Sequence, residues 1–326
     1  MNMKVSKAIL AFFAAIGITY ASGDKVTAVM HASEGNAEKQ IEDMMKHKIS
    51  KAGFNVMKAN THIEKFYYEK YKERGVEMIS FYDVINKEAI RPLLLSNPDF
   101  GAFTPFNFLV YKSLDAKNDN FTWYGHLDAD MMLDIIGEKD AANREAFKKI
   151  VDGLDAVAKE TLKPVKEKVF PRSKPLPKVT LTKMVKRFDA PDDMEEFVED
   201  FVMEHDGRFS KHNFIIAGFI DLKFEYSDMD LSFDKYDAYW VSLLCHFEFS
   251  NSIFNRGKPE AGMFAPCSIY FYIPKGKNEL HVGYSSVSNW ISGLDFSDKK
   301  RIEYMQSIDA EVVETFKELG FELIQK

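Results

Sequence analysis

The sequence predicts an α+β protein in which two tandem repeats each pack helices on one face of an antiparallel sheet. Three observations support this prediction. The chain has 326 residues, a length that suits two domains. A set of landmark residues recurs in the same order about 160 positions later. In each half, several strand-like segments lie between one helical segment and a final long helical segment.

The repeat is clearest in the segments NPDFGAFTPFNFLVY and KPEAGMFAPCSIYFY, which align without a gap. The shared positions are Pro98, Gly101, Phe103, Pro105 and Tyr111 in the first half and, 161 residues later, Pro259, Gly262, Phe264, Pro266 and Tyr272 in the second. Lys25-Val26-Thr27 and Lys178-Val179-Thr180 precede these blocks, and Leu154-Asp155-Ala156 and Ile308-Asp309-Ala310 follow them. Because chance seldom preserves such an order, we infer a tandem duplication.

The first half begins with a predicted strand at 25–31 and a predicted helix at 36–52. Asn36 is a suitable N-cap for that helix. Its apolar positions recur at the helical period, at Ile41, Met44, Met45 and Ile49. Gly53 can adopt the left-handed conformation that ends a helix, so 54–59 is predicted as the second strand.

The rest of the first half alternates strands with helical turns. The predicted elements are a strand at 76–86, a helical turn at 88–95, a hairpin of 105–112 and 120–127, and a long helix at 141–162. The second half repeats this order and ends with a helix over about 298–319. Strands that meander between two helices are typical of α+β domains.

The N-terminal segment 1–23 has the three parts of a secretory signal peptide. Lys4 and Lys7 form a basic start, the run from Ala8 to Tyr20 is apolar, and small residues follow. A retained membrane anchor is the alternative, although the run is shorter than the 20 or so residues that span a bilayer. We therefore expect an exported protein, periplasmic in a Gram-negative source or otherwise secreted, with no transmembrane segment in the mature chain.

A basic stretch rich in proline separates the two repeats. Its prolines are Pro164, Pro171, Pro175 and Pro177. Such a composition predicts a semi-rigid extended linker. The expected organisation is therefore a first domain at 24–163, a linker at 164–177 and a second domain at 178–326.

Composition excludes several classes of function. The formal net charge is −7, which disfavours a nucleic-acid partner held by bulk charge. Two cysteines are too few for a disulfide scaffold or a four-thiolate zinc site. The sequence has no nucleophile elbow, phosphate-binding glycine loop, dinucleotide fingerprint or His-Glu-x-x-His motif. We therefore expect no catalytic residues, no cofactor and no metal site.

Two sets of residues are candidates for a groove. The repeated block, with Gly101, Phe103, Pro105, Gly262, Phe264 and Pro266, either shapes a strand entry or forms the mouth of a groove. The second set comprises aromatic connections, with Phe66, Tyr67, Tyr68 and Tyr71 in the first half and Phe224, Tyr226, Phe233, Tyr236, Tyr239 and Trp240 in the second. These aromatics form either ordinary core or a lid over an apolar ligand.

Cys245 and Cys267 are the only thiols of the chain. They fall on consecutive predicted strands near facing ends, where a disulfide is within reach. Three interpretations stay open for this pair. The thiols form a structural bridge, they are buried and unpaired, or they act together in redox chemistry or in binding a soft metal such as copper(I).

The segment YWVSLLCHFEFSNSIFNRGKPEAGMFAPCSIYFY resembles the family known as domain of unknown function 302. That family carries a Cys-Asn-Pro step and a later Leu-Pro-Cys step. Cys245 matches the first cysteine, with His246 and Phe247 in place of Asn and Pro, and Pro266-Cys267 matches the second step. In the first half, Val84 and Phe106 stand where the thiols are expected. The resemblance implies a fold like that of the TATA-binding protein and no established activity.

Two functions follow as hypotheses. The first is an exported, non-catalytic binding or interaction protein whose partner is an apolar small molecule or another exported protein. The alternative is a thiol redox or soft-metal-handling protein that acts through Cys245 and Cys267.

Overall fold

The computed structural model describes residues 25–172 and 174–325, and the predicted signal peptide at 1–23 lies outside them. These residues form two six-stranded antiparallel sheets, one in each half, with helices packed against them. The α+β prediction with two similar halves is therefore confirmed. Within the described ranges, no helix combines the length and the apolar character needed to cross a membrane.

The first sheet has the strand order β2-β3-β4-β5-β1-β6. Its strands are β1 (Val26–Glu34), β2 (Asn55–Asn60), β3 (Val76–Ile85), β4 (Phe106–Ser113), β5 (Phe121–Leu127) and β6 (Lys166–Pro171). The helices and helical turns of this half are α1 (Glu38–His47), η1 (Ile49–Ala52), α2 (Ile63–Tyr71), α3 (Lys87–Ser96), η2 (Pro98–Phe103), α4 (Ala129–Ile136) and α5 (Ala141–Leu162).

The second sheet has the order β12-β7-β11-β10-β9-β8. Its strands are β7 (Leu181–Arg187), β8 (Phe214–Asp221), β9 (Tyr236–His246), β10 (Cys267–Pro274), β11 (Glu279–Ser285) and β12 (Glu322–Gln325). Its helical elements are α6 (Met194–Lys211), α7 (Leu222–Asp228), α8 (Phe247–Ser250), η3 (Asn251–Asn255), η4 (Pro259–Phe264), α9 (Ser288–Gly293) and α10 (Lys299–Glu318). The strand order of the second sheet, taken from its other edge, thus repeats that of the first sheet strand by strand.

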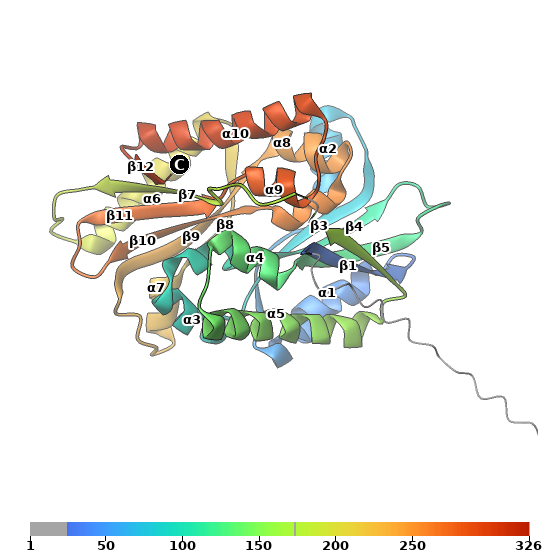
Figure 1. The fold of residues 1–326 in the computed structure, drawn as a ribbon, viewed down its shortest axis with the longest axis horizontal. Helices are drawn as coiled ribbons and strands as arrows, with labels where there is room; N and C mark the ends of the chain where they lie inside the picture. The colour runs from blue at the N-terminus through green and yellow to red at the C-terminus, as the bar shows by residue number, and fades with distance from the viewer. Residues whose placement is uncertain (1–24, 173, 326) are drawn as a thin grey trace, which may run out of the picture.

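The long helices α5 and α10 lie on opposite sides of the molecule, with the sheets between them (Figure 1). Helix α5 begins after Asp140, whose side chain accepts a hydrogen bond from the backbone N–H of Asn143. It buries one stripe at helical spacing, formed by Phe147, Val151, Leu154, Ala158 and Leu162. Asp298 caps α10 in the same way, so the paired helices share their start as well as their position.

The strand register corrects the alignment of the two halves by one residue. Phe106 pairs with Val84, and its counterpart Cys267 pairs with Leu244. The first-half equivalent of Cys245 is therefore Ile85 rather than Val84. The helix caps agree, because Asn86 and His246 follow these positions and each accepts a hydrogen bond from the backbone N–H three residues later.

The stretch predicted as a linker is in part a strand. Residues 166–171 form β6, which pairs with β1 at the edge of the first sheet. An edge strand accepts Pro171 at its end because the missing N–H donor is not needed there. Lysines at Lys166 and Lys168 suit an exposed edge, since charge discourages pairing with another chain.

The two aromatic connections are helical, and each packs on the opposite half. Helix α2 places the ring of Tyr67 against Phe247 of the second half, with ring centroids 5.1 Å apart. Helix α7 places Tyr226 on the first half, where its hydroxyl donates to the backbone carbonyl of Lys87 over 2.8 Å. The connections therefore bind the halves to each other reciprocally.

Candidate functional site

The repeated glycine–proline blocks lie where the two halves meet. A Cβ atom on Gly101 would come within 3 Å of the hydroxyl of Tyr239 and of Tyr270 in the second half. A Cβ on Gly262 would come within 3 Å of Leu109 and Phe81 in the first half. Each block thus lies against the sheet of the other half, an arrangement with approximate two-fold symmetry. Glycine is needed at both positions for this close approach.

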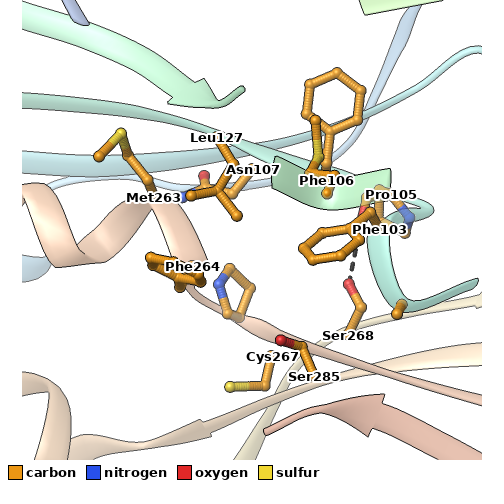
Figure 2. A pocket seen from close by; sticks show the side chains of 13 residues that line it. Phe103, Pro105, Phe106, Asn107, Leu127, Met263, Phe264, Cys267, Ser268 and Ser285 are labelled. Atoms are coloured by element: carbon orange, nitrogen blue, oxygen red, sulfur yellow. Dashed lines mark hydrogen bonds between the residues drawn. The ribbon is translucent and has the colours of Figure 1, made fainter. Parts of the chain in front are cut away.

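The blocks also line a small cavity on this symmetry axis, the axial cavity. It is lined by pairs of equivalent residues, including Phe103 and Phe264, Pro105 and Pro266, Phe106 and Cys267, and Asn107 and Ser268. Figure 2 shows Ser268 reaching across to Pro105, whose carbonyl accepts its hydroxyl over 3.1 Å. The volume is about 20 Å³, enough for one water molecule and too small for an apolar ligand. The repeated blocks therefore join the halves.

The two thiols point to different sides of the second sheet. Cys267 and Leu244 are direct partners in the register and share a face, so Cys245, next to Leu244, points to the other face. The cysteines are unpaired. Burial raises the pKa of Cys245 to about 11 and that of Cys267 to about 12. At neutral pH both groups are protonated thiols, which are poor nucleophiles and poor metal ligands.

We expect both thiols to stay free when the folded protein is treated with a mild oxidant such as diamide. With a pKa of about 11, on the order of one Cys245 thiol in 10⁴ is ionised at pH 7, so exchange is slow. Intact mass should show no loss of two hydrogens, and alkylation after unfolding should modify both cysteines without reduction. Alkylation only after reduction would contradict the geometry.

The surroundings of Cys267 differ from those of its first-half equivalent, Phe106. Tyr284 is buried near it, and its hydroxyl has no hydrogen-bond partner among residues 25–172 and 174–325. Burial raises the pKa of Asp309, on α10, to about 6. The first-half equivalents, His126 and Asp155, instead form an ion pair of 3.0 Å. The duplicated halves have therefore diverged beneath their long helices.

Cys245 lines a larger cavity between the edge strands β2 and β8, which we call the seam cavity. Its volume is about 200 Å³. Its walls are mainly apolar and come from both halves: Ile63, Tyr67 and Phe81 from the first, and Ile215, Ile216, Ala217, Cys245, Phe247, Phe254, Ala265 and Pro266 from the second. Lys58, Asn60 and Ser250 complete the lining.

Tyr67 lies in the wall of this cavity, with its hydroxyl closed off from solvent. Tyr67 is fully buried, and its hydroxyl makes no hydrogen bond of good geometry within the part of the chain that the structure describes, although the Ser250 hydroxyl lies close enough to lower its pKa against the larger effect of burial. Its second-half equivalent, Tyr226, is satisfied by the carbonyl of Lys87. The corresponding carbonyl for Tyr67 belongs to Phe247, but it accepts the hydroxyl of Ser250 over 2.8 Å. The equivalent tyrosines of the two halves therefore differ in their hydrogen bonding.

The symmetry-related position, the mate hollow, is polar. Val56, Met57 and Ile85 line it where Ile216, Ala217 and Cys245 line the seam cavity. Lys87 and Glu225 form an ion pair of 2.5 Å at this position, and Asp221 adds a further carboxylate. The duplication thus produced one apolar site and one charged site from the same framework.

Acidic clusters in the sequence have structural partners. Asp128 caps α4 by accepting the backbone N–H groups of Asp130 and Met131. Asp134 pairs with Lys25, Arg144 and Arg172. Across the described residues, no group of three or more His, Cys, Asp or Glu side chains is arranged to hold a metal ion.

The chain is similar in structure to an uncharacterised conserved protein of the DUF302 family from Bacillus stearothermophilus. The two share 19% sequence identity with a TM-score of 0.35. The match covers 40% of this chain and 95% of the other. No family model matches the sequence, and no curated protein matches it.

The sequence analysis identified Cys245, Tyr67 and Phe224 as candidates. It did not predict that Cys245 and Tyr67 lie at the same site. The seam cavity joins Cys245 to Tyr67 across the two halves, whereas Phe224 lines the mate hollow. Lys58 and Phe254 were missed, since a lone lysine in a strand and a phenylalanine in a helical turn carry no motif. Only the docking of the halves makes them neighbours.

Proposed function

We propose that this protein is an exported, non-catalytic binding protein that holds a small apolar molecule in the seam cavity. The observation that carries the proposal is a cavity of about 200 Å³ between the two halves whose lining is mainly apolar and includes four aromatic side chains. An engineered apolar cavity of about 150 Å³ binds benzene, so this space suits a ligand with one ring. Export rests on the segment 1–23 alone.

The thiol alternative has less support. Cys245 and Cys267 lie on opposite faces of the sheet, and burial raises the pKa of both. A redox pair needs two sulfurs within bonding reach and one of them readily ionised. Cys245 is better understood as a small, polarisable part of an apolar wall.

Toluene binding tests the proposal. We expect toluene to raise the melting temperature of the wild-type protein, because a ligand that binds only the folded state stabilises it. Ala217→Phe places a ring in the seam cavity and should weaken toluene binding at least about tenfold, or 1.4 kcal/mol. Titration calorimetry provides the affinities.

Met57→Phe is the matched control, because Met57 holds the position equivalent to Ala217 in the mate hollow. It should leave the toluene affinity within about twofold of wild type. Absence of toluene binding to the wild-type protein, or equal weakening by both substitutions, would overturn the proposal.

A further inference from the structure

We infer that the ligand of the seam cavity is a single-ring aromatic carboxylate, with its carboxylate on Lys58 and its ring among the aromatic side chains. The inference rests on the proposed function and specifies the chemical class of the ligand. It combines two properties of the cavity: its size and aromatic lining, and the presence of one cation in an otherwise uncharged wall.

The cation is Lys58, the only charged residue among those of 25–172 and 174–325 that line the seam cavity. Its ammonium has no carboxylate within 4 Å among the described residues. Lys58 is solvent-exposed, so the charge stands at the mouth of the cavity and its apolar stem lies along the wall. A cation placed in this way attracts an anionic group on a ligand whose remainder is apolar.

One acidic side chain lies near Lys58 without neutralising it. Asp83 is the direct partner of Lys58 in the register between β2 and β3. It is 1% exposed, and burial raises its pKa well above the usual range, although the charge of Lys58 opposes this shift. Asp83 forms no ion pair with Lys58 among the described residues, so the ammonium of Lys58 is available to a ligand.

The aromatic lining favours a ring over an alkyl chain. Tyr67, Phe81, Phe247 and Phe254 come from four different elements and surround the same space. Aromatic rings pack favourably edge-to-face or offset against one another.

Benzoate and toluene, which differ mainly in the carboxylate, separate this inference from the proposed function. We expect Lys58→Met to weaken benzoate binding at least about tenfold, the scale of one charge-assisted hydrogen bond. The same substitution should leave the toluene affinity within about twofold, because methionine keeps the apolar stem. Lys65→Met is the control, since it removes an exposed lysine of α2 that does not line the cavity.

The outcomes are distinguishable. Loss of benzoate affinity in Lys58→Met alone, with toluene affinity kept, supports the ligand class. If toluene binds but benzoate does not, or if Lys58→Met and Lys65→Met weaken benzoate equally, the ligand class is wrong and the proposed function stands. If neither compound binds to the wild-type protein, both proposals are overturned.

Discussion

Gly101→Ala should destabilise the protein by about 3 kcal/mol, at the upper end of the cost of overpacking a core. The added methyl group would lie within 3 Å of the hydroxyl of Tyr239 and of Cβ and Cγ of Tyr270. Both tyrosines are buried, and their hydroxyls donate to the carbonyl of Pro98 and the carboxylate of Asp99 over 2.6 Å. These hydrogen bonds keep the rings from turning aside, so the two halves must move apart.

Two other glycine substitutions provide comparisons for the stability change of Gly101→Ala, measured by urea unfolding. Gly262→Ala should cost less, about 1–2 kcal/mol, because its nearest neighbours are terminal side-chain atoms of Leu109 and Phe81 that can shift. Gly207→Ala, at an open position within α6, should stabilise by up to about 1 kcal/mol through helix propensity. Similar stabilities for Gly101→Ala and Gly207→Ala would show that the halves do not dock through this block.

Asp83→Asn should stabilise the protein by about 1–3 kcal/mol at pH 8. The gain is expected because the substitution removes a buried unsatisfied polar group, which usually costs that amount. Asp83 Oδ2 and Asn107 Oδ1 have no partners within the described ranges, and the two residues are opposite each other in the register. An asparagine at position 83 supplies an N–H donor without a charge. The second half has Leu243 at the equivalent position, so the fold does not require an acid there.

The stability gained by Asp83→Asn should increase with pH. Burial raises the folded-state pKa of Asp83 above the unfolded value of about 3.9, so folding favours the protonated form. Its contribution to stability is complete below the unfolded pKa and declines as the pH rises toward the folded pKa. The stability difference between Asp83→Asn and wild type should therefore grow from pH 4 to pH 8.

Urea unfolding across this pH range measures the difference directly. Asp152→Asn is the control, because Asp152 is exposed on α5 and its substitution should change stability by no more than about 0.5 kcal/mol. A gain from Asp83→Asn that is independent of pH would contradict a raised pKa. A loss of stability at pH 8 would contradict the burial of an unpaired carboxyl.

Local signals in the sequence predicted most of the fold. The amphipathic stripe within 141–162 predicted α5 with the observed bounds, Ala141–Leu162. The repeated block identified 98–103 and 259–264 as equivalent segments, but it did not predict that they form the helical turns η2 and η4. The short helices α2, α7 and α9 were not predicted, because helices of this length depend on tertiary packing more than on their own propensity.

The one-residue error that matched Cys245 with Val84 instead of Ile85 has a local cause. The second half has one more residue between His246 and Pro259 than the first half has between Asn86 and Pro98. A π-helical turn, η3, accommodates the insertion, which leaves the flanking strand and block in register. An ungapped offset of 161 therefore holds downstream of this turn and becomes 160 upstream of it.

The seam cavity could not be predicted from local patterns. Tyr67 and Tyr226 are equivalent tyrosines in equivalent helices, yet only Tyr226 has its carbonyl partner. The difference arises because Ser250 occupies the carbonyl that Tyr67 would use. The lining of the seam cavity also depends on the docking of the halves, because Tyr67 meets Phe247 from 180 positions away in the chain.

A crystal exposed to bromobenzene would test most directly whether the seam cavity, and not its mate, receives an aromatic ring. We predict an anomalous bromine peak among Tyr67, Phe247 and Phe254, with no comparable peak beside Lys87 and Glu225. An empty seam cavity, or a peak of equal height in the mate hollow, would contradict the proposed binding site.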